Sequence, residues 1–303
     1  MNHASEPTDG RTRRISLRVF RHTAGDGGEP RFDTFELDVP PGTTVLTALF
    51  MIQQQQDPSL AFRFSCRGAV CGSCGMTING RCGLACRTQL WSMPTSEVIL
   101  EPLPNLDVVR DLVVDMSPFW EKYRRVRPWL HNLVEAGRAG AGSGCCGSGS
   151  AGTPASGAAA REQLQSPRQF QRIEQYINCI LCACCYGACP VLKRQPDYLG
   201  PAALAKMNRF VGDSRDRRPP EQLEEVDNVD GVWGCDTVFR CVDACPKDVR
   251  PTDGIAALRR RLVFYRVRNL VKRLQRSASP APEPRAQNHD AMNGMRGVAH
   301  ETA

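Results

Sequence analysis

Long apolar runs are absent from this sequence, and histidine is scarce. No stretch approaches the ~18 consecutive apolar residues of a membrane-spanning helix. The N-terminal stretch MNHASEPTDGRTRR has no apolar run either, so we predict no secretory signal and no oxidising setting for a disulfide framework. A Rieske centre is excluded because no histidine lies near the cysteine groups. The histidines are His3, His22, His131, His289 and His300.

Motifs of several enzyme classes are missing as well. No GxGxxG follows a predicted strand, so nothing indicates a flavin or nicotinamide bound by this chain. No Ser/His/Asp or Cys/His arrangement indicates nucleophilic catalysis. The net charge is +7, from 39 Lys and Arg against 32 Asp and Glu. This mild excess fits an anionic partner surface or a solvated basic face.

Cysteine, by contrast, is abundant: the chain has 15 in 303 residues. Grouped thiols that stay reduced indicate bound metal. The run CILCACCYGACP has the spacing Cys179-x2-Cys182-x2-Cys185-x3-Cys189-Pro190. In bacterial ferredoxins, three cysteines of such a run bind one iron–sulfur cluster and the fourth binds a second. A second run therefore has to exist, and its residues are Cys235, Cys241 and Cys245-Pro246, with Val238 where a full run has another cysteine.

Two clusters follow from the ligand count over both runs. The predicted ligands of a [4Fe–4S] cluster are Cys179, Cys182, Cys185 and Cys245. Only three thiolates remain for the second cluster, namely Cys189, Cys235 and Cys241. A cubane without a protein ligand at one corner readily loses that iron, so we predict a [3Fe–4S] cluster there. Cys184 is left over as a packed thiol. Zinc is the alternative, but one zinc site needs only two short ligand motifs.

A third cluster is predicted nearer the N-terminus. The spacing Cys66-x4-Cys71-x2-Cys74 is the plant-type pattern for a [2Fe–2S] cluster. The fourth ligand is Cys86 or Cys82. We prefer Cys86, because GLAC brings the chain back as an extended segment, whereas Cys82 lies beside an Asn-Gly turn and is expected to point away.

The predicted fold class is α+β. In residues 14–136, the alternating stretches 15–20 and 34–39 and the stretch 96–103 indicate strands. A helix is predicted over 43–52 with Thr44 as N-cap, and Asn79-Gly80 indicates a hairpin. The further divisions are a Gly/Ala/Ser linker at 137–160, a helical domain at 161–275 and a disordered tail at 276–303.

Three clusters in series move single electrons, so the chain is predicted to be a conductor between a donor and an acceptor bound elsewhere. Two alternatives remain. Cys145 and Cys146 form GCCG within the linker, and a Cys-Cys-Gly signature also marks some disulfide-reducing iron–sulfur proteins. The chain could then serve a thiol- or heterodisulfide-linked fumarate reductase. The other alternative is a freestanding ferredoxin-like carrier.

Several stretches together resemble the iron–sulfur subunit of succinate dehydrogenase / fumarate reductase (respiratory complex II). They are SCRGAVCGSCGMTINGRCGLACRT, VRDLVVDMSPFWEKYRRVRPWL, CILCACCYGACPVL, GPAALAKMNRFVGDSRDRR and CVDACPKDVRPTDGI. The resemblance covers roughly residues 14–265 outside the linker. It implies a β-grasp plant-type ferredoxin-like domain followed by an all-α bacterial-ferredoxin-like domain.

The resemblance also implies partners. These are a flavoprotein subunit with covalent FAD that interconverts succinate and fumarate, and a membrane anchor, often with haem b, at which quinone reacts. The [2Fe–2S] cluster would lie nearest the flavin and the [3Fe–4S] cluster nearest the quinone. A peripheral place on the cytoplasmic face of the cell membrane follows, and no nucleic-acid partner is expected.

The chain departs from the family near the quinone side. Relatives often carry tryptophan after the Cys-Pro, where this chain has Val191, and a histidine where it has Asp236. Menaquinone or an atypical anchor is therefore favoured over ubiquinone-type contacts. Pro190 and Arg259 match quinone-side positions of relatives, with Arg259 in place of lysine. The alternative for Arg259 is a headgroup or surface contact.

The C-terminal helix is strongly basic. Its cations are Arg259, Arg260, Arg261, Arg266, Arg268, Lys272, Arg273 and Arg276. Its apolar residues are expected on one helical face, and they are Ile255, Leu258, Leu262, Val263, Val267, Leu270, Val271 and Leu274. Attraction to anionic headgroups beside a membrane anchor explains the charge better than nucleic acid does. A solvated amphipathic helix is the alternative.

Overall fold

The computed structural model describes residues 12–25, 27–131 and 163–278. Contacts divide the chain into one compact unit that ends at Leu262 and a second that begins at Val263. The predicted 137–160 linker, Cys145 and Cys146, and the tail beyond Ala278 lie outside the described residues. Across the part that is described, no helix combines the length and apolarity needed to cross a bilayer.

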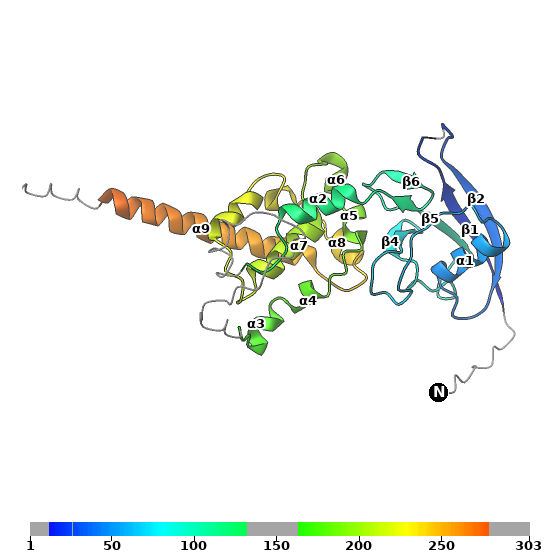
Figure 1. Cartoon of the computed structure of the whole chain (residues 1–303), viewed down its shortest axis with the longest axis horizontal. Coiled ribbons are helices and arrows are strands. Elements are labelled where there is room, and N and C mark those ends of the chain that lie inside the picture. The colour runs from blue at the N-terminus through cyan, green and yellow to red at the C-terminus, as the bar shows by residue number, and fades with distance from the viewer. Residues whose placement is uncertain (1–11, 26, 132–162, 279–303) are drawn as a thin grey trace, which may run out of the picture. The chain divides into compact units, whose positions relative to one another are not determined.

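The first unit begins with a five-stranded mixed sheet in the order β2-β1-β5-β3-β4 (Figure 1). Its strands are β1 (Arg13–Arg21), β2 (Arg31–Val39), β3 (Gly75–Ile78), β4 (Arg81–Leu84) and β5 (Glu97–Glu101). β1 pairs antiparallel with β2 and parallel with β5. A small second sheet joins β6 (Val108–Arg110) to β7 (Val113–Val114). The predicted alternation is confirmed, because Ile15, Leu17 and Val19 are buried on one face.

The local signals read from the sequence have the expected structural effects. Helix α1 (Val45–Gln55) begins after Thr44, whose side chain accepts a hydrogen bond from the Thr47 main-chain N–H. Asn79 and Gly80 both have positive φ, 48° and 73°, and they join β3 to β4 as a two-residue hairpin loop. The predicted cap and hairpin are therefore confirmed.

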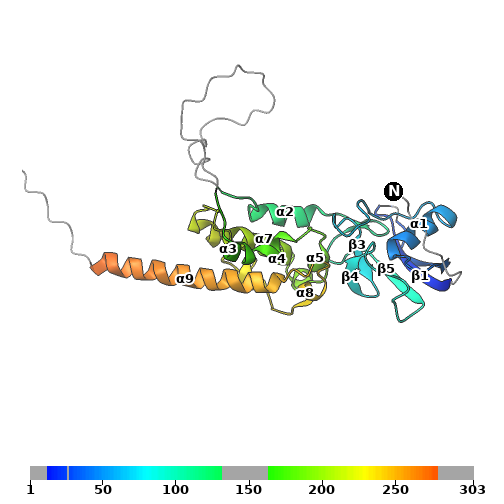
Figure 2. The ribbon, with the colours of Figure 1, turned by 90° about the horizontal axis from the view of Figure 1, so that it is seen from below.

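Short helices make up the rest of the first unit. They are α2 (Ser117–Arg125), α3 (Pro167–Gln171), α4 (Glu174–Ile177), α5 (Cys184–Gly187), α6 (Pro190–Arg194), α7 (Gly200–Val211), η2 (Pro220–Val226), η3 (Val232–Gly234) and α8 (Arg240–Asp243), followed by the start of α9 (Pro251–Ala278). Figure 2 shows α2, α4 and α5 beside α7, which contacts all three. A sheet part followed by a helical part confirms the α+β prediction.

The sheet part and the helical part share one continuous hydrophobic core that includes residues from Ile15 to Leu262. Polar contacts join them as well. The Asn105 side-chain amide donates to the main-chain carbonyls of Tyr186, Gly187 and Cys189, each at 3.0 Å. The Arg87 guanidinium donates to the Pro246 carbonyl. The cysteine-rich loops of the two parts are thereby fixed against each other.

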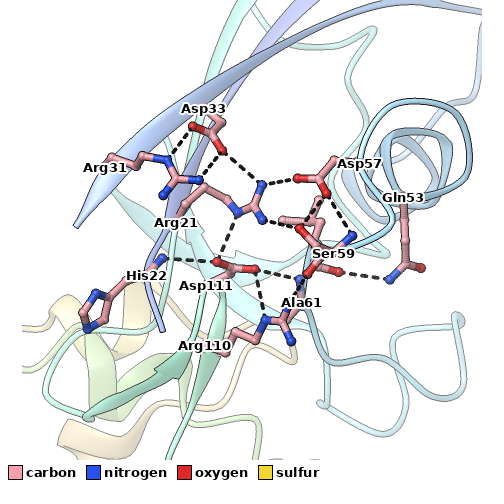
Figure 3. Close-up of polar contacts among 11 residues, drawn as sticks. Arg21, His22, Arg31, Asp33, Gln53, Asp57, Ser59, Ala61, Arg110 and Asp111 are labelled. Carbon is pink, nitrogen blue, oxygen red and sulfur yellow. Dashed lines mark hydrogen bonds and ion pairs between the residues drawn. The ribbon is translucent and has the colours of Figure 1, made fainter. Parts of the chain in front are cut away.

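A buried arginine at the C-terminal end of β1 forms a network of ion pairs and hydrogen bonds (Figure 3). Arg21 is 6% exposed and contacts three carboxylates, those of Asp33, Asp57 and Asp111. Asp111 also accepts a hydrogen bond from the main-chain N–H of Ala61 at 2.9 Å. The network thus ties β1 and β2 to the segment that leads into the first cysteine loop.

Both flanks of the undescribed stretch 132–162 are attached to the same loop. His131 accepts a hydrogen bond at its carbonyl from the Arg217 N–H at 2.8 Å. Gln165, on the other flank, donates through Nε2 to Asp213 at 3.1 Å. Segment 213–217 therefore holds the chain on both sides of that stretch.

Helix α9 corrects two expectations. It extends to Ala278, so residues 276–278 are helical rather than part of a disordered tail. The prediction of a single apolar face is wrong. In the first unit, Ile255, Leu258 and Leu262 are buried in the core. In the second unit the remaining apolar positions are exposed, namely Val263, Val267, Leu270, Val271 and Leu274. With 3.6 residues per turn, the two sets fall on different sides of an ideal helix.

Candidate metal centres

A cavity lined by four cysteines lies in the helical part. Its walls include Cys179, Cys182, Cys185 and Cys245. These are the four residues that the sequence assigns to the [4Fe–4S] cluster. They come from the loop before α5, from α5 itself and from the turn after α8, so the fold brings the two runs together as the interlocking pattern requires.

A second cavity has three cysteines in its wall. They are Cys189, Cys235 and Cys241, the residues assigned to the [3Fe–4S] cluster. Val238, which stands in the sequence where a full run has another cysteine, lines the same cavity. Tyr198, which is 1% exposed, closes one side of it.

Each cavity has at least one cysteine sulfur that accepts a hydrogen bond from a main-chain N–H group. Val249 N–H donates to Cys245 Sγ at 3.3 Å, and Thr237 N–H donates to Cys235 Sγ at 3.4 Å. The Thr252 hydroxyl lies 3.2 Å from Cys241 Sγ. Such donors stabilise a thiolate and also set the reduction potential of a cluster that it binds.

Burial acts in the other direction on several of these thiols. It raises the pKa of Cys179, Cys185 and Cys245 around the first cavity. A hydrogen bond from Cys184 lowers the pKa of Cys182 to about 7. Binding of iron to this set must therefore displace protons from thiols that prefer to stay neutral, and that displacement couples cluster loading to pH.

The third group of cysteines lies in an exposed loop of the sheet part. Cys66 Sγ accepts hydrogen bonds from the N–H groups of Gly68, Val70 and Cys71 at 3.4, 3.3 and 3.2 Å. A hydrogen bond from Ser73 lowers the pKa of Cys71 to about 6. A ring of amide donors of this kind suits the sulfurs of a [2Fe–2S] site.

The structure distinguishes the environments of Cys86 and Cys82. The N–H of Ala85 donates to the Cys74 carbonyl at 3.0 Å, so the chain at Cys86 returns to the cysteine loop. Cys82 instead lies on β4, 3.8 Å from the Thr77 hydroxyl and beside Gly187 of the helical part. The assignment of Cys86 as fourth ligand stays a prediction, and this geometry favours it.

The two quinone-side candidates have different surroundings. Pro190 lines the second cavity. The Arg259 guanidinium donates to the carbonyls of Val232 and Cys235 at 2.8 and 2.6 Å, and its carbon lies 5.6 Å from the centre of the Trp233 ring. Arg259 therefore holds the segment that carries Cys235. Whether either residue touches quinone stays a prediction.

Two positioning residues were not foreseen from the sequence. Arg259 was singled out for another reason, and Asn105 was not singled out at all. Asn105 has a φ of 62°, a left-handed conformation that asparagine tolerates better than most residues. An asparagine directly after the Leu-Pro pair at 103–104 could have suggested a turn, but not the carbonyls that it reaches.

The cysteine arrangement suits clusters better than single ions. Among the residues that the structure describes, no group of three or more His, Cys, Asp or Glu side chains is placed to hold one metal ion. Seven of the cysteines instead line the walls of two cavities, as the ligands of a multi-iron core must. The residues present therefore fit iron–sulfur clusters.

Comparison with known families agrees with both cysteine-rich regions. Residues 16–121 match the model of a "2Fe-2S iron-sulfur cluster binding domain". Residues 175–249 match the model of a "4Fe-4S dicluster domain". The matched ranges contain all eleven cysteines assigned above as ligands.

Whole-chain comparisons give relatives of similar length. The succinate dehydrogenase iron–sulfur subunit of Coxiella burnetii is 35% identical over 81% of this chain and 95% of its own. The fumarate reductase iron–sulfur subunit of Mycobacterium tuberculosis is 38% identical over 80% and 90%. A chain of the Mycobacterium smegmatis Sdh1 complex in the apo form superposes with a TM-score of 0.65 and 25% identity, over 84% of this chain and 98% of that one.

Proposed function

Because the chain belongs to the family of succinate dehydrogenase and fumarate reductase iron–sulfur subunits, we propose a specific route by which it carries electrons. It is the electron-transfer subunit of an oxidoreductase complex of this family. Iron–sulfur clusters bound to this chain would supply one-electron transfer, and its cysteine thiolates would hold and position them.

The proposed ligand sets are those of the exposed cysteine loop with Cys86 and of the two cavities. Cys66, Cys71, Cys74 and Cys86 would hold [2Fe–2S]. Cys179, Cys182, Cys185 and Cys245 would hold [4Fe–4S]. Cys189, Cys235 and Cys241 would hold [3Fe–4S]. The observation that carries the proposal is the separation of seven cysteines into one cavity with four and one with three.

Close packing between the two parts supports a continuous route. A Cβ on Gly72 would lie 2.8 Å from the Cβ of Cys182, so the [2Fe–2S] loop and a [4Fe–4S] ligand are in contact only because residue 72 is glycine. The Arg87–Pro246 hydrogen bond joins the residues that follow Cys86 and Cys245. Both contacts shorten the path between the first and second clusters.

The two ends of the route carry exposed apolar side chains. Phe64 and Val70, beside the first cysteine loop, are 42% and 66% exposed. We infer that this face receives a flavoprotein subunit with FAD. Val238 and Phe239, beside the second cavity, are also exposed, and that face would meet a membrane anchor and quinone. The complex would then lie at the cytoplasmic face of the membrane, with haem b an option of the anchor.

The sheet topology supports a β-grasp assignment for the ferredoxin-like sheet part, with the helical part as the bacterial-ferredoxin-like domain. No separate argument from the described residues favours a thiol-linked reductase, since Cys145 and Cys146 lie outside them. A freestanding carrier would leave both apolar ends uncovered, which favours the complex.

The test is a redox titration of the purified complex followed by EPR, with iron analysis and assays of succinate-dependent dye and quinone reduction. Three distinct signals and roughly nine irons per chain, the sum over the three clusters, are expected. Intact clusters without a copurifying flavoprotein, or zinc in place of iron, would overturn the proposal.

A further inference from the structure

The second unit begins with an exposed amphipathic helix, residues 263–275 of α9. Its apolar stripe consists of Val263, Phe264, Val267, Leu270, Val271 and Leu274, with exposed fractions between 45% and 73%. Successive residues are about 100° apart in a helix, so the stripe fills a sector about 120° wide. All six side chains are exposed in the part of the chain that the structure describes.

The rest of the helix surface is basic. Arg266, Arg268, Lys272 and Arg273 are exposed outside the stripe. No Asp or Glu occurs between residues 254 and 278. A continuous apolar sector on a helix whose only charges are cations is the pattern of a helix that lies in the plane of a bilayer surface.

The charge of the helix indicates which kind of binding partner its apolar stripe contacts. A second copy of the helix would bring its own cations against these, which disfavours self-association. Anionic headgroups are complementary to the basic flanks, and acyl chains are complementary to the stripe. A protein partner would need an acidic rim around an apolar groove.

We propose that residues 263–275 bind the surface of an anionic membrane directly, with the apolar stripe among the acyl chains and the flanking cations at the headgroups. This contact is separate from any anchor subunit. It depends neither on the clusters nor on the function proposed above, because none of the residues involved lines a cysteine cavity.

The test uses the full chain with its clusters loaded, sedimented with vesicles. Phosphatidylcholine alone is compared with an equal mixture of phosphatidylcholine and phosphatidylglycerol. We expect strong binding to the mixture and weak binding to phosphatidylcholine. Replacing Arg268 and Lys272 by Gln should weaken binding to the mixture by about 25-fold, about fivefold for each charge.

The stripe is tested by the pair Leu270→Gln and Leu274→Gln, expected to weaken binding about tenfold or more. Tyr265→Gln introduces the same residue on the opposite side of the helix and should leave binding unchanged. Circular dichroism verifies that the helix persists in each variant.

The proposal is overturned if the wild-type chain does not bind the mixture, or if the stripe variant binds like the wild type. It is also overturned if the stripe variant binds vesicles normally but no longer copurifies with partner subunits, because the occupant is then a protein. Cluster spectra and iron content, which report on the proposed function, should not change in any variant.

Discussion

The side-chain amide of Asn105 donates a hydrogen bond of 3.0 Å to the main-chain carbonyl of Cys189. Asn105 belongs to the sheet part, and Cys189 lines the second cavity of the helical part. A candidate ligand of the proposed [3Fe–4S] cluster is therefore held in place by the sheet part, which carries the proposed [2Fe–2S] site. Assembly of the second cavity therefore depends on correct packing of the sheet part against the helical part.

Asn105→Gly should lower the free energy of unfolding by about 1–3 kcal/mol, because three partly buried carbonyls lose a donor. Glycine relieves rather than adds strain at this φ of 62°, so the loss reports the hydrogen bonds. Urea denaturation of the full chain measures it. Asn105→Asp keeps the size but cannot donate, and an Asp variant as stable as the wild type would contradict this role.

Gly72→Ala should destabilise the chain more than Gly80→Ala. The two glycines have φ values of 74° and 73°, so alanine brings similar backbone strain at both. Only at Gly72 does the new methyl group meet other atoms, at 2.8 Å from Cys182 Cβ, which adds about 1–3 kcal/mol of overpacking. Denaturation curves of the two variants compare the losses. Equal losses would mean that the loops do not touch at Gly72.

Arg21→Gln should lower the free energy of unfolding by about 3–5 kcal/mol, since it removes the buried cation shared by three carboxylates and leaves the buried Asp111 with only the half-exposed Arg110 at 4.0 Å. Hydrogen bonds from Ser59 and then Arg21 hold the pKa of Asp57 at about 2, below its ordinary 3.8. A carboxyl group with a lowered pKa stabilises the fold fully above pH 3.8, its ordinary pKa. That stabilisation is lost as the pH falls through about 2. Melting temperatures across a pH series should therefore show the gap between variant and wild type narrowing in that window. A gap that stays constant with pH would reject the carboxylate interpretation.

Cys71 should be the first thiol of its loop to react with iodoacetamide in the cluster-free chain. Its pKa of about 6 makes it a thiolate at neutral pH, whereas burial raises the pKa of Cys74 to about 12. Peptide mass spectrometry should show the Cys71 rate rising as the pH passes 6 and Cys74 unmodified. In Ser73→Ala the midpoint should move upward, because the main hydrogen bond to the thiolate is lost. Identical rates at both cysteines would refute this assignment.

Val238→Cys should convert the proposed three-iron cluster into [4Fe–4S] and lower its reduction potential, because a fourth thiolate becomes available in the cavity wall. EPR of the oxidised protein measures the loss of the three-iron signal. Val238→Ala is the matched control and should retain that signal. Persistence of the signal in the cysteine variant would show that residue 238 does not face the vacant corner.

Local chemistry was predictable from the sequence, and long-range geometry was not. The Thr44 cap and the Asn79-Gly80 turn depend on neighbouring residues only, so a short stretch determines them. The cysteine spacing predicted which cysteines line each cavity, because the spacing within a run reflects how a short loop folds around a cluster. The parallel pairing of β1 with β5 and the reach of Asn105 to Cys189 depend on packing across tens of residues, which no local pattern encodes.

Helix α9 shows why periodicity alone misled. The apolar spacing was counted as one series across residue 262, but Leu262 is buried and Val263 is exposed. Two consecutive apolar residues allow one stripe to end and another to begin on a different side without any polar interruption. The burial of each side chain, which the sequence does not record, separates the two.

The attachment of His131 and Gln165 to the loop at 213–217 has a practical consequence. The residues on both sides of positions 132–162 are hydrogen-bonded to the same loop. A foreign domain inserted between them should therefore disturb neither the cysteine loops nor the shared core. A fluorescent reporter or affinity handle placed there offers a way to follow biogenesis of the assembly in living cells while both chain ends stay native.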